Sequence, residues 1–275
     1  MSPKEMPQPQ NNNWWIPAAI AGALLLIVLA IGALLILPKL NSVANEVPEQ
    51  GTPAASTNGS VIGTNALPAS EDMLQVVAGN YQVGISPADD FHAAKQTVSL
   101  AEFWIAKYPV TNDQYQGYIQ QTGAPAPQLW PGDAKHPVRG VNWEQANAYC
   151  TWMKERLPTE AEWEAAGRGP ANKPPLFPWG DDPIDGGKVL QMPDQDTYEV
   201  GSLSFNVNPL GLYDLVGDVW QWVGDPYTNV QQGYKILRGG RYGLPQDLAY
   251  RIAVAPDDSR YVKFAGFRCA ADTVR

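Results

Sequence analysis

The sequence has few residues of the kinds that bind transition metals or nucleic acids. Its 275 residues include only two histidines and two cysteines, too few for a zinc site of several His and Cys ligands. Charged residues make up 17%, and 19 Lys and Arg stand against 28 Asp and Glu, giving a net charge of −9. Binding to phosphates needs a concentration of basic side chains, so no nucleic-acid partner is expected.

One segment near the N-terminus has no charge at all. Residues 16–37 are mostly apolar and, as a helix, would span roughly 30 Å, the thickness of the hydrocarbon core of a bilayer. Trp14 and Trp15 precede this run, where indole rings favour the membrane interface, and Lys39 follows it. We therefore predict a transmembrane helix over residues 14–39.

A cleaved signal peptide is the alternative for this segment. Ser42–Ala44 resembles a cleavage site, but the apolar core of a signal peptide is normally about 7–15 residues long, and this one is longer. The length favours a retained anchor. The charges leave its orientation open, because Lys4 lies before the span and Lys39 lies after it.

The segments on either side of the span differ in character. Residues 1–13 are predicted to form a short tail. Residues 40–72 are rich in Ser, Thr, Asn, Ala, Pro and Gly, and cannot bury enough apolar area to offset their chain entropy, so they are predicted to be a flexible linker. The remaining residues, 73–275, are enough for one domain with its own core.

Local signals predict short helices and strands in residues 73–275. Three cap residues are each followed, three positions later, by Gln or Glu, the spacing of a capping box: Thr111 with Gln114, Asn142 with Gln145, and Thr159 with Glu162. Short runs of β-branched and aromatic residues predict strands over Leu74–Val77, Tyr81–Val83, Val98–Leu100, Phe103–Ala106 and Ile236–Arg238. Long loops rich in Gly and Pro join these elements, so the predicted class is α+β with much irregular structure.

A series of motifs in these residues resembles one protein family. In chain order they are Tyr108–Asn112, Val141–Trp143, Ala148–Trp152, Arg156–Glu164 (RLPTEAEWE), Phe177–Gly180, Asn208–Trp222 (NPLGLYDLVGDVWQW), Leu237–Gly240 and Gly266–Asp272. In this order and spacing they closely resemble the formylglycine-generating enzyme, or sulfatase-modifying factor, family. The resemblance covers essentially all of 73–275. It implies a single domain of the C-type-lectin-like variety, preceded here by one transmembrane helix.

The resemblance also implies which activity is missing. Enzymes of the family bind copper(I) through two cysteines five residues apart and, with oxygen, oxidise a substrate cysteine to formylglycine; thiolates suit the soft cuprous ion. The two positions fall at Leu244 and Ala249, which have no ligand atom, and no cysteine lies between Cys150 and Cys269. We expect no copper and no oxidase activity of this type.

The two cysteines resemble a structural disulfide pair of the family. A bridge between Cys150 and Cys269 would close a loop of about 119 residues and stabilise the fold by several kcal/mol in the chain-entropy model. Two buried free thiols are the alternative. A disulfide implies an oxidising compartment. We therefore predict a single-pass protein of the cytoplasmic (inner) membrane, with a cytoplasmic N-terminus and the domain in the periplasm or extracellular space.

The segment Gly211–Trp222 resembles a calcium loop of the family. The resemblance gives the side chains of Asp214 and Gln221 and the carbonyls of Gly217 and Val219 as ligands. Calcium prefers six to eight oxygens, several of them anionic, and Gln221 stands where the family often has Glu. Two alternatives therefore remain open: the loop binds calcium with reduced affinity, or it folds without metal.

Two functions are compatible with these features. The favoured one is a non-catalytic binding or accessory protein, whose partners are other membrane-protein subunits or an extracytoplasmic protein or peptide. Its contact surface would correspond to the family's catalytic groove, lined by Arg241, Tyr242, Leu244, Ala249, Tyr250 and Arg251. The alternative is an enzyme of the same family with a mechanism that does not use copper. Convergent polar groups would favour the enzyme, and an exposed apolar patch would favour the binding protein.

Overall fold

The computed structural model describes the C-terminal domain of the chain. The residues it describes are 72–130, 132–170, 172–181, 197–227, 233–240 and 247–273. The predicted tail, transmembrane helix and nearly all of the linker lie outside these ranges. Within them, every helix is too short or too polar to cross a bilayer.

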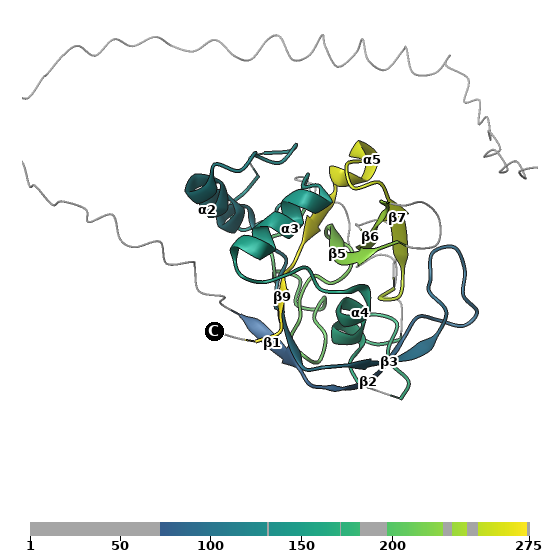
Figure 1. Ribbon diagram of the computed structural model, residues 1–275. Helices are drawn as coiled ribbons and strands as arrows, with labels where there is room; N and C mark the ends of the chain where they lie inside the picture. The colour runs from purple at the N-terminus through teal and green to yellow at the C-terminus, as the bar shows by residue number, and fades with distance from the viewer. Residues whose placement is uncertain are drawn as a thin grey trace, which may run out of the picture. The chain divides into compact units, whose positions relative to one another are not determined.

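Two of the sheets are built from the first strands of the domain and its last strand (Figure 1). One sheet has the order β1-β4-β9, with antiparallel neighbours, and contains β1 (Met73–Val76), β4 (Phe103–Ala106) and β9 (Ala270–Ala271). Another is the antiparallel pair of β2 (Gly79–Val83) and β3 (Gln96–Leu100). Because β4 lies between β1 and β9, it holds the beginning and the end of the domain together.

A four-stranded sheet forms the other part of the domain. Its order is β7-β6-β5-β8, with β5 (Trp220–Pro226), β6 (Lys235–Arg238), β7 (Arg251–Val254) and β8 (Ala265–Phe267). β6 is antiparallel to both β5 and β7, whereas β8 runs parallel to β5. β5 is thus a central strand, and it carries Gln221 of the predicted calcium loop into the core.

Three helices begin where their capping signals predict: α2 (Asn112–Thr122), α3 (Trp143–Trp152) and α4 (Glu160–Arg168). The structure adds a short helix that was not predicted, α5 (Ser259–Val262). All three predicted capping boxes are present, with both reciprocal hydrogen bonds between the cap residue and the Gln or Glu three positions on. This confirms the three predicted helix starts, because each cap satisfies backbone N–H groups that the first turn leaves without partners.

The predicted strands are present, with ends that differ by at most two residues. The structure adds four strands that the sequence analysis missed, β5, β7, β8 and β9. β5 begins with four consecutive buried residues, and β8 and β9 are buried throughout, so these strands lack the alternation of apolar and polar residues that marks a half-buried strand. β8 and β9 also pair with strands far away in the sequence, β5 and β4 respectively.

Two clusters of buried apolar side chains form the core. The first lies beneath α2 and α3 and includes Tyr115, Tyr149, Trp222, Phe267 and Cys269. The rings of Tyr115 and Tyr149 stack with centroids 5.5 Å apart. The second cluster packs α4 against the β2–β3 pair and β4 and includes Tyr81, Phe103, Ile105, Trp163 and Leu215. The two clusters meet at the four-stranded sheet, since both contain residues of β5 and β6.

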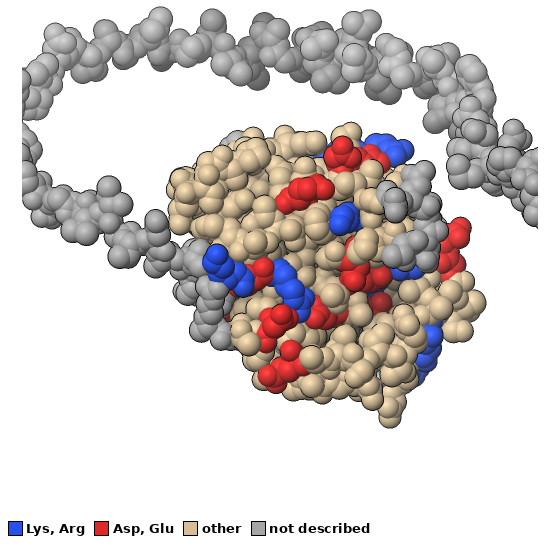
Figure 2. Space-filling model, in the orientation of Figure 1, with Lys and Arg blue, Asp and Glu red and all other residues tan. Residues whose placement is uncertain are grey.

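The surface over α2 and α3 carries little charge. Figure 2 shows this part of the domain as mostly uncharged, whereas acidic and basic side chains lie interspersed over the rest of the face in view. α2 contains one acidic and no basic residue. The face in view therefore offers no concentration of basic side chains of the kind that binds phosphates.

Gly239, directly after β6, occupies a position that only glycine tolerates. Its φ is +82°, and a Cβ there would press into the carbonyl oxygen of Leu215 and lie 3.3 Å from the ring of Trp163. Gly239→Ala is expected to lower the free energy of unfolding by about 3 kcal/mol, the sum of a left-handed backbone and a clash with fixed backbone. Urea unfolding of the full chain, followed by tryptophan fluorescence, measures this loss.

Gly233 provides the matched control. Its φ is +96°, but a Cβ there would meet nothing within 4 Å. Gly233→Ala is therefore expected to cost only about 1 kcal/mol, the backbone contribution alone. Equal losses in the two variants would show that the close approach to Leu215 does not matter.

Candidate functional site

The predicted contact groove lies partly within the described residues. Ala249, Tyr250 and Arg251 are described, whereas Arg241, Tyr242 and Leu244 lie outside the described residues. Ala249 is 1% exposed, and its N–H donates to Oδ1 of Asp247 at 2.8 Å. Its methyl group is part of the core, so Ala249 offers a partner no contact surface.

Tyr250 belongs to an aromatic cluster that the sequence did not predict. Its ring stacks on Phe91, with centroids 5.4 Å apart and an interplanar angle of 7°, and meets the edge of His92 at 5.5 Å and Trp220 at 6.0 Å. The backbone N–H of Arg251 donates to the carbonyl oxygen of Phe91 at 2.8 Å, which fixes the two segments to each other. Phe91 is 48% exposed, so the cluster presents a large apolar ring to solvent.

A polar edge borders this aromatic cluster. Nδ1 of His92 lies 2.6 Å from Oδ1 of Asp89, and Nε2 lies 3.4 Å from Oδ2 of Asp247. The hydrogen bond to His92, assisted by one from the N–H of Phe91, lowers the pKa of Asp89. His92 thus links two carboxylates from distant parts of the chain, and no local motif indicated that link.

Arg251 belongs to a network of ion pairs that extends from half-buried side chains into the core. Its Nη1 lies 3.0 Å from Oε2 of Glu160, and Nη1 of Arg238 lies 2.7 Å from Oε1 of the same carboxylate. Nη2 of Arg238 lies 2.8 Å from Glu164, which also binds Nη1 of Arg168 at 2.7 Å. The network joins α4 to β6 and β7. Arg251 is therefore held in place by Glu160.

The three Glu residues of RLPTEAEWE have different roles. A capped helix accounts for Glu162, which closes the capping box and also lies 2.6 Å from Nη1 of Arg156. It does not account for Glu160 or Glu164, whose carboxylates pair with arginines from other elements. A cavity of about 300 Å³ beside Glu160 is also lined by Asp225, Tyr227 and Arg251.

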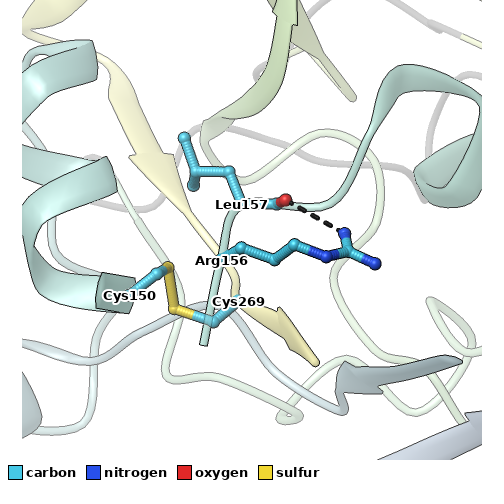
Figure 3. The surroundings of a disulfide bond; sticks show 4 residues. All are labelled: Cys150, Arg156, Leu157 and Cys269. Atoms are coloured by element: carbon cyan, nitrogen blue, oxygen red, sulfur yellow. Dashed lines mark hydrogen bonds between the residues drawn. A yellow bond between two sulfur atoms is a disulfide. The ribbon is translucent and has the colours of Figure 1, made fainter. Parts of the chain in front are cut away.

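The disulfide predicted from the family resemblance is present (Figure 3). It joins Cys150 on α3 to Cys269, with the two Cα atoms 5.6 Å apart. Beside it, the backbones of Arg156 and Ala270 exchange two hydrogen bonds of 2.9 and 2.7 Å. The segment before α4 is thus fixed to β9 next to the disulfide. The bond between Cys150 and Cys269 confirms the predicted pairing and excludes two free thiols.

The two side chains among the predicted calcium ligands, Asp214 and Gln221, have different surroundings. Asp214 is buried; its Oδ2 accepts a hydrogen bond from the N–H of Gly201 at 2.6 Å, and its Oδ1 is buried without a hydrogen-bond partner. The side-chain oxygen of Gln221 already accepts hydrogen bonds from Trp163 and Arg268. Within the described residues, no group of three or more His, Cys, Asp or Glu is placed to hold a metal. Oδ1 of Asp214 could therefore face a cation, whereas the side-chain oxygen of Gln221 already accepts two hydrogen bonds.

Burial raises the pKa of Asp214 to about 6, although the N–H of Gly201 and the charge of Arg268 act in the opposite direction. The raised value means that protonation of Asp214 stabilises the fold. That stabilisation is complete below pH 3.8 and is lost as the pH rises through about 6.

Asp214→Asn is expected to remove this pH dependence. The difference in free energy of unfolding between wild type and variant should change by about 2 kcal/mol between pH 4.5 and pH 7.5, in favour of the wild type at the lower pH. Urea unfolding in EDTA at the two pH values measures it. The exposed Asp113→Asn is the control, and an unchanged difference between wild type and Asp214→Asn would contradict the raised pKa.

Comparison with known sequences identifies relatives of this chain. A family model described as "Sulfatase-modifying factor enzyme 1-like domain" matches residues 59–273. The serine/threonine-protein kinase pkn1 of Chlamydia caviae is 31% identical over 74% of this chain and 38% of its own length. The formylglycine-generating enzyme of Mus musculus is 36% identical, over 50% of this chain and 45% of its own length. The chain thus spans about two fifths of the length of the kinase-named relatives and less than half of the mouse enzyme.

Two further similarities extend over most of the domain. The inactive C-alpha-formylglycine-generating enzyme 2 of Bos taurus is 27% identical over 74% of this chain and 89% of its own length. Among solved structures, PvdO from Pseudomonas aeruginosa aligns with a TM-score of 0.61 and 23% identity, covering 73% of this chain and 94% of that chain. At that identity the structural match establishes the fold alone.

Proposed function

The chain belongs to the family of sulfatase-modifying factor enzyme 1-like domains, and we propose that it uses this scaffold as a non-catalytic binding or accessory protein. The observation that carries the proposal is that the chain has two cysteines and both form the Cys150–Cys269 disulfide. No thiolate remains to bind copper(I), the ion on which the family's enzymes rely. A relative that bears the name of an inactive enzyme supports the proposal.

The proposed location is the outer face of the cytoplasmic membrane. Disulfides persist in oxidising compartments, which supports placing the domain in the periplasm or extracellular space. Residues 16–37 would anchor it, with the N-terminus in the cytoplasm. A domain tethered there is positioned to contact other membrane-protein subunits or an extracytoplasmic protein or peptide, and we propose such a partner.

The aromatic cluster around Phe91 and Tyr250 is the proposed contact surface. Phe91 is exposed, yet its ring is held by stacking on Tyr250, so little side-chain freedom would be lost on binding. Rigid aromatic side chains dominate the binding energy of many interfaces. The polar edge formed by His92 and its two carboxylates would supply hydrogen bonds at the rim.

Isolation of the full chain from gently solubilised native membranes tests this proposal. We expect other membrane subunits to co-purify in stoichiometric amounts, and Phe91→Ala to reduce their recovery at least tenfold. Val77→Ala is the matched control, because Val77 is 55% exposed and contributes nothing to the aromatic cluster. A lone particle of 30.0 kDa plus detergent, or equal recovery from both variants, would contradict the proposal.

An enzyme with a mechanism that does not use copper is the alternative. The observation in its favour is the convergence of Asp89, His92 and Asp247 beside Tyr250. Incubating the full chain with a cysteine-containing peptide and oxygen, in the absence of copper, tests the alternative. We expect mass spectrometry to detect no conversion of cysteine to formylglycine; conversion without copper that is lost in His92→Ala would establish the enzyme.

A further inference from the structure

The side chain of Gln221 is buried in the core, and its contacts fix how its amide is oriented. Its Oε1 accepts hydrogen bonds from Nε1 of Trp163 at 3.1 Å and from Nε of Arg268 at 2.7 Å. Both of these nitrogens are donors without a lone pair, so only the oxygen of the amide can face them. The amide nitrogen must therefore point the other way.

On that other side the amide nitrogen faces carbonyl oxygens of the predicted calcium loop. Nε2 of Gln221 donates to the carbonyl oxygen of Asp214 at 2.8 Å and lies 3.4 Å from that of Leu215. These contacts are made by the positively polarised N–H groups of the amide. A glutamate at this position would instead bring a second negative oxygen to the same two carbonyls, and a cation would be needed between them.

Arg268 brings a full positive charge next to the amide of Gln221. Its guanidinium is completely buried and donates to five oxygens. They are the side-chain oxygen of Gln221 and the carbonyl oxygens of Ala106, Lys107, Tyr213 and Asp214. Two carbonyl oxygens of this loop, those of Tyr213 and Asp214, thus already face a cationic donor within the chain.

We propose that the amide of Gln221, together with the guanidinium of Arg268, takes the place of calcium in this loop, so that the loop folds without the ion. The calcium that the family resemblance implies would need the oxygen of Gln221, and that oxygen is engaged by two donors. This inference is independent of the proposed binding function. Oδ1 of Asp214 is buried without a hydrogen-bond partner, so it is the oxygen of this loop at which a bound ion would be detected.

Thermal unfolding of the full chain in mild detergent, stripped of metal with EDTA, tests the proposal. Tryptophan fluorescence gives the Tm with and without added CaCl2. We expect the wild-type Tm to be unchanged by calcium. A rise of several degrees that disappears in Asp214→Asn would overturn the proposal, because it would place the ion at the buried carboxylate of Asp214.

Gln221→Glu tests the role of the amide directly. In EDTA its Tm should fall by several degrees, since a carboxylate oxygen replaces the N–H groups that face Asp214 and Leu215. Added CaCl2 should restore most of that loss. Gln120→Glu, an exposed substitution of the same charge on α2, should show neither effect. A folded Gln221→Glu that is indifferent to calcium would overturn the proposal; if this variant does not fold, the comparison of wild type with Asp214→Asn decides.

Discussion

Replacing Cys150 and Cys269 together by alanine is expected to lower the free energy of unfolding by about 5 kcal/mol, the largest loss we predict. The disulfide joins residues 119 apart in the sequence, so it removes much of the freedom of the unfolded chain. Both cysteines are buried, and the substitution also leaves unfilled volume in the core beneath α3. Urea unfolding of the full chain under oxidising conditions measures the loss.

Reductant supplies the control for this prediction. The wild type, unfolded in the presence of a strong reductant, should approach the stability of the double variant, whereas the double variant should be insensitive to reductant. A double variant within about 1 kcal/mol of the oxidised wild type would show that the bridge contributes little. A large loss on reduction would support the proposed location outside the cytoplasmic membrane, because disulfides persist in oxidising compartments.

Arg238→Met is expected to cost about 4 kcal/mol of unfolding free energy, the second largest effect. Arg238 is completely buried, and its guanidinium binds Glu160, Glu164 and the carbonyl oxygen of Leu248. Methionine keeps much of the volume but leaves the carboxylates with one cation fewer in the interior. Removing one member of a buried ion-pair network is strongly destabilising, and here Glu160 and Glu164 would each keep only one of their two arginine partners, Arg251 and Arg168.

Arg260→Met is the matched control for Arg238→Met. Arg260 forms an ion pair with Asp258 at 2.6 Å, but its side chain is 80% exposed, and an exposed pair contributes about 1 kcal/mol or less. The two variants lose the same charge and differ in burial. Urea unfolding of both, at one pH and ionic strength, therefore isolates the effect of burial, and equal losses would contradict the structural role of the network.

The network around Arg238 also bears on the proposed contact surface. Glu160 on α4 holds Arg251, the residue that follows Tyr250 in the aromatic cluster. Arg251 in turn donates its backbone N–H to Phe91. The position of the exposed ring of Phe91 thus depends on Arg251 and, through it, on the ion pair with Glu160. These contacts account for the rigidity proposed for this surface.

The proposed contact surface could be predicted from the sequence only in part. The resemblance placed a groove around residues 241–251, and of its described members only Tyr250 takes part in an exposed cluster. Ala249 is buried and Arg251 is paired with Glu160. Phe91 and His92, which complete the cluster, carry no motif in the sequence, because their role depends on a contact between segments more than 150 residues apart.

The sequence by itself determined the features that depend on near neighbours in the chain or on a strong family pattern. The three helix starts follow from pairs of residues three positions apart, and the cysteine pairing follows from the resemblance. Only the tertiary structure decided that Glu160 and Glu164 pair with arginines of β6 and β7, that Phe91 stacks on Tyr250, and that the amide of Gln221 faces the carbonyls of its own loop. A capping box forms within a single turn of helix, whereas these contacts exist only after distant segments have packed together and water has been excluded between them.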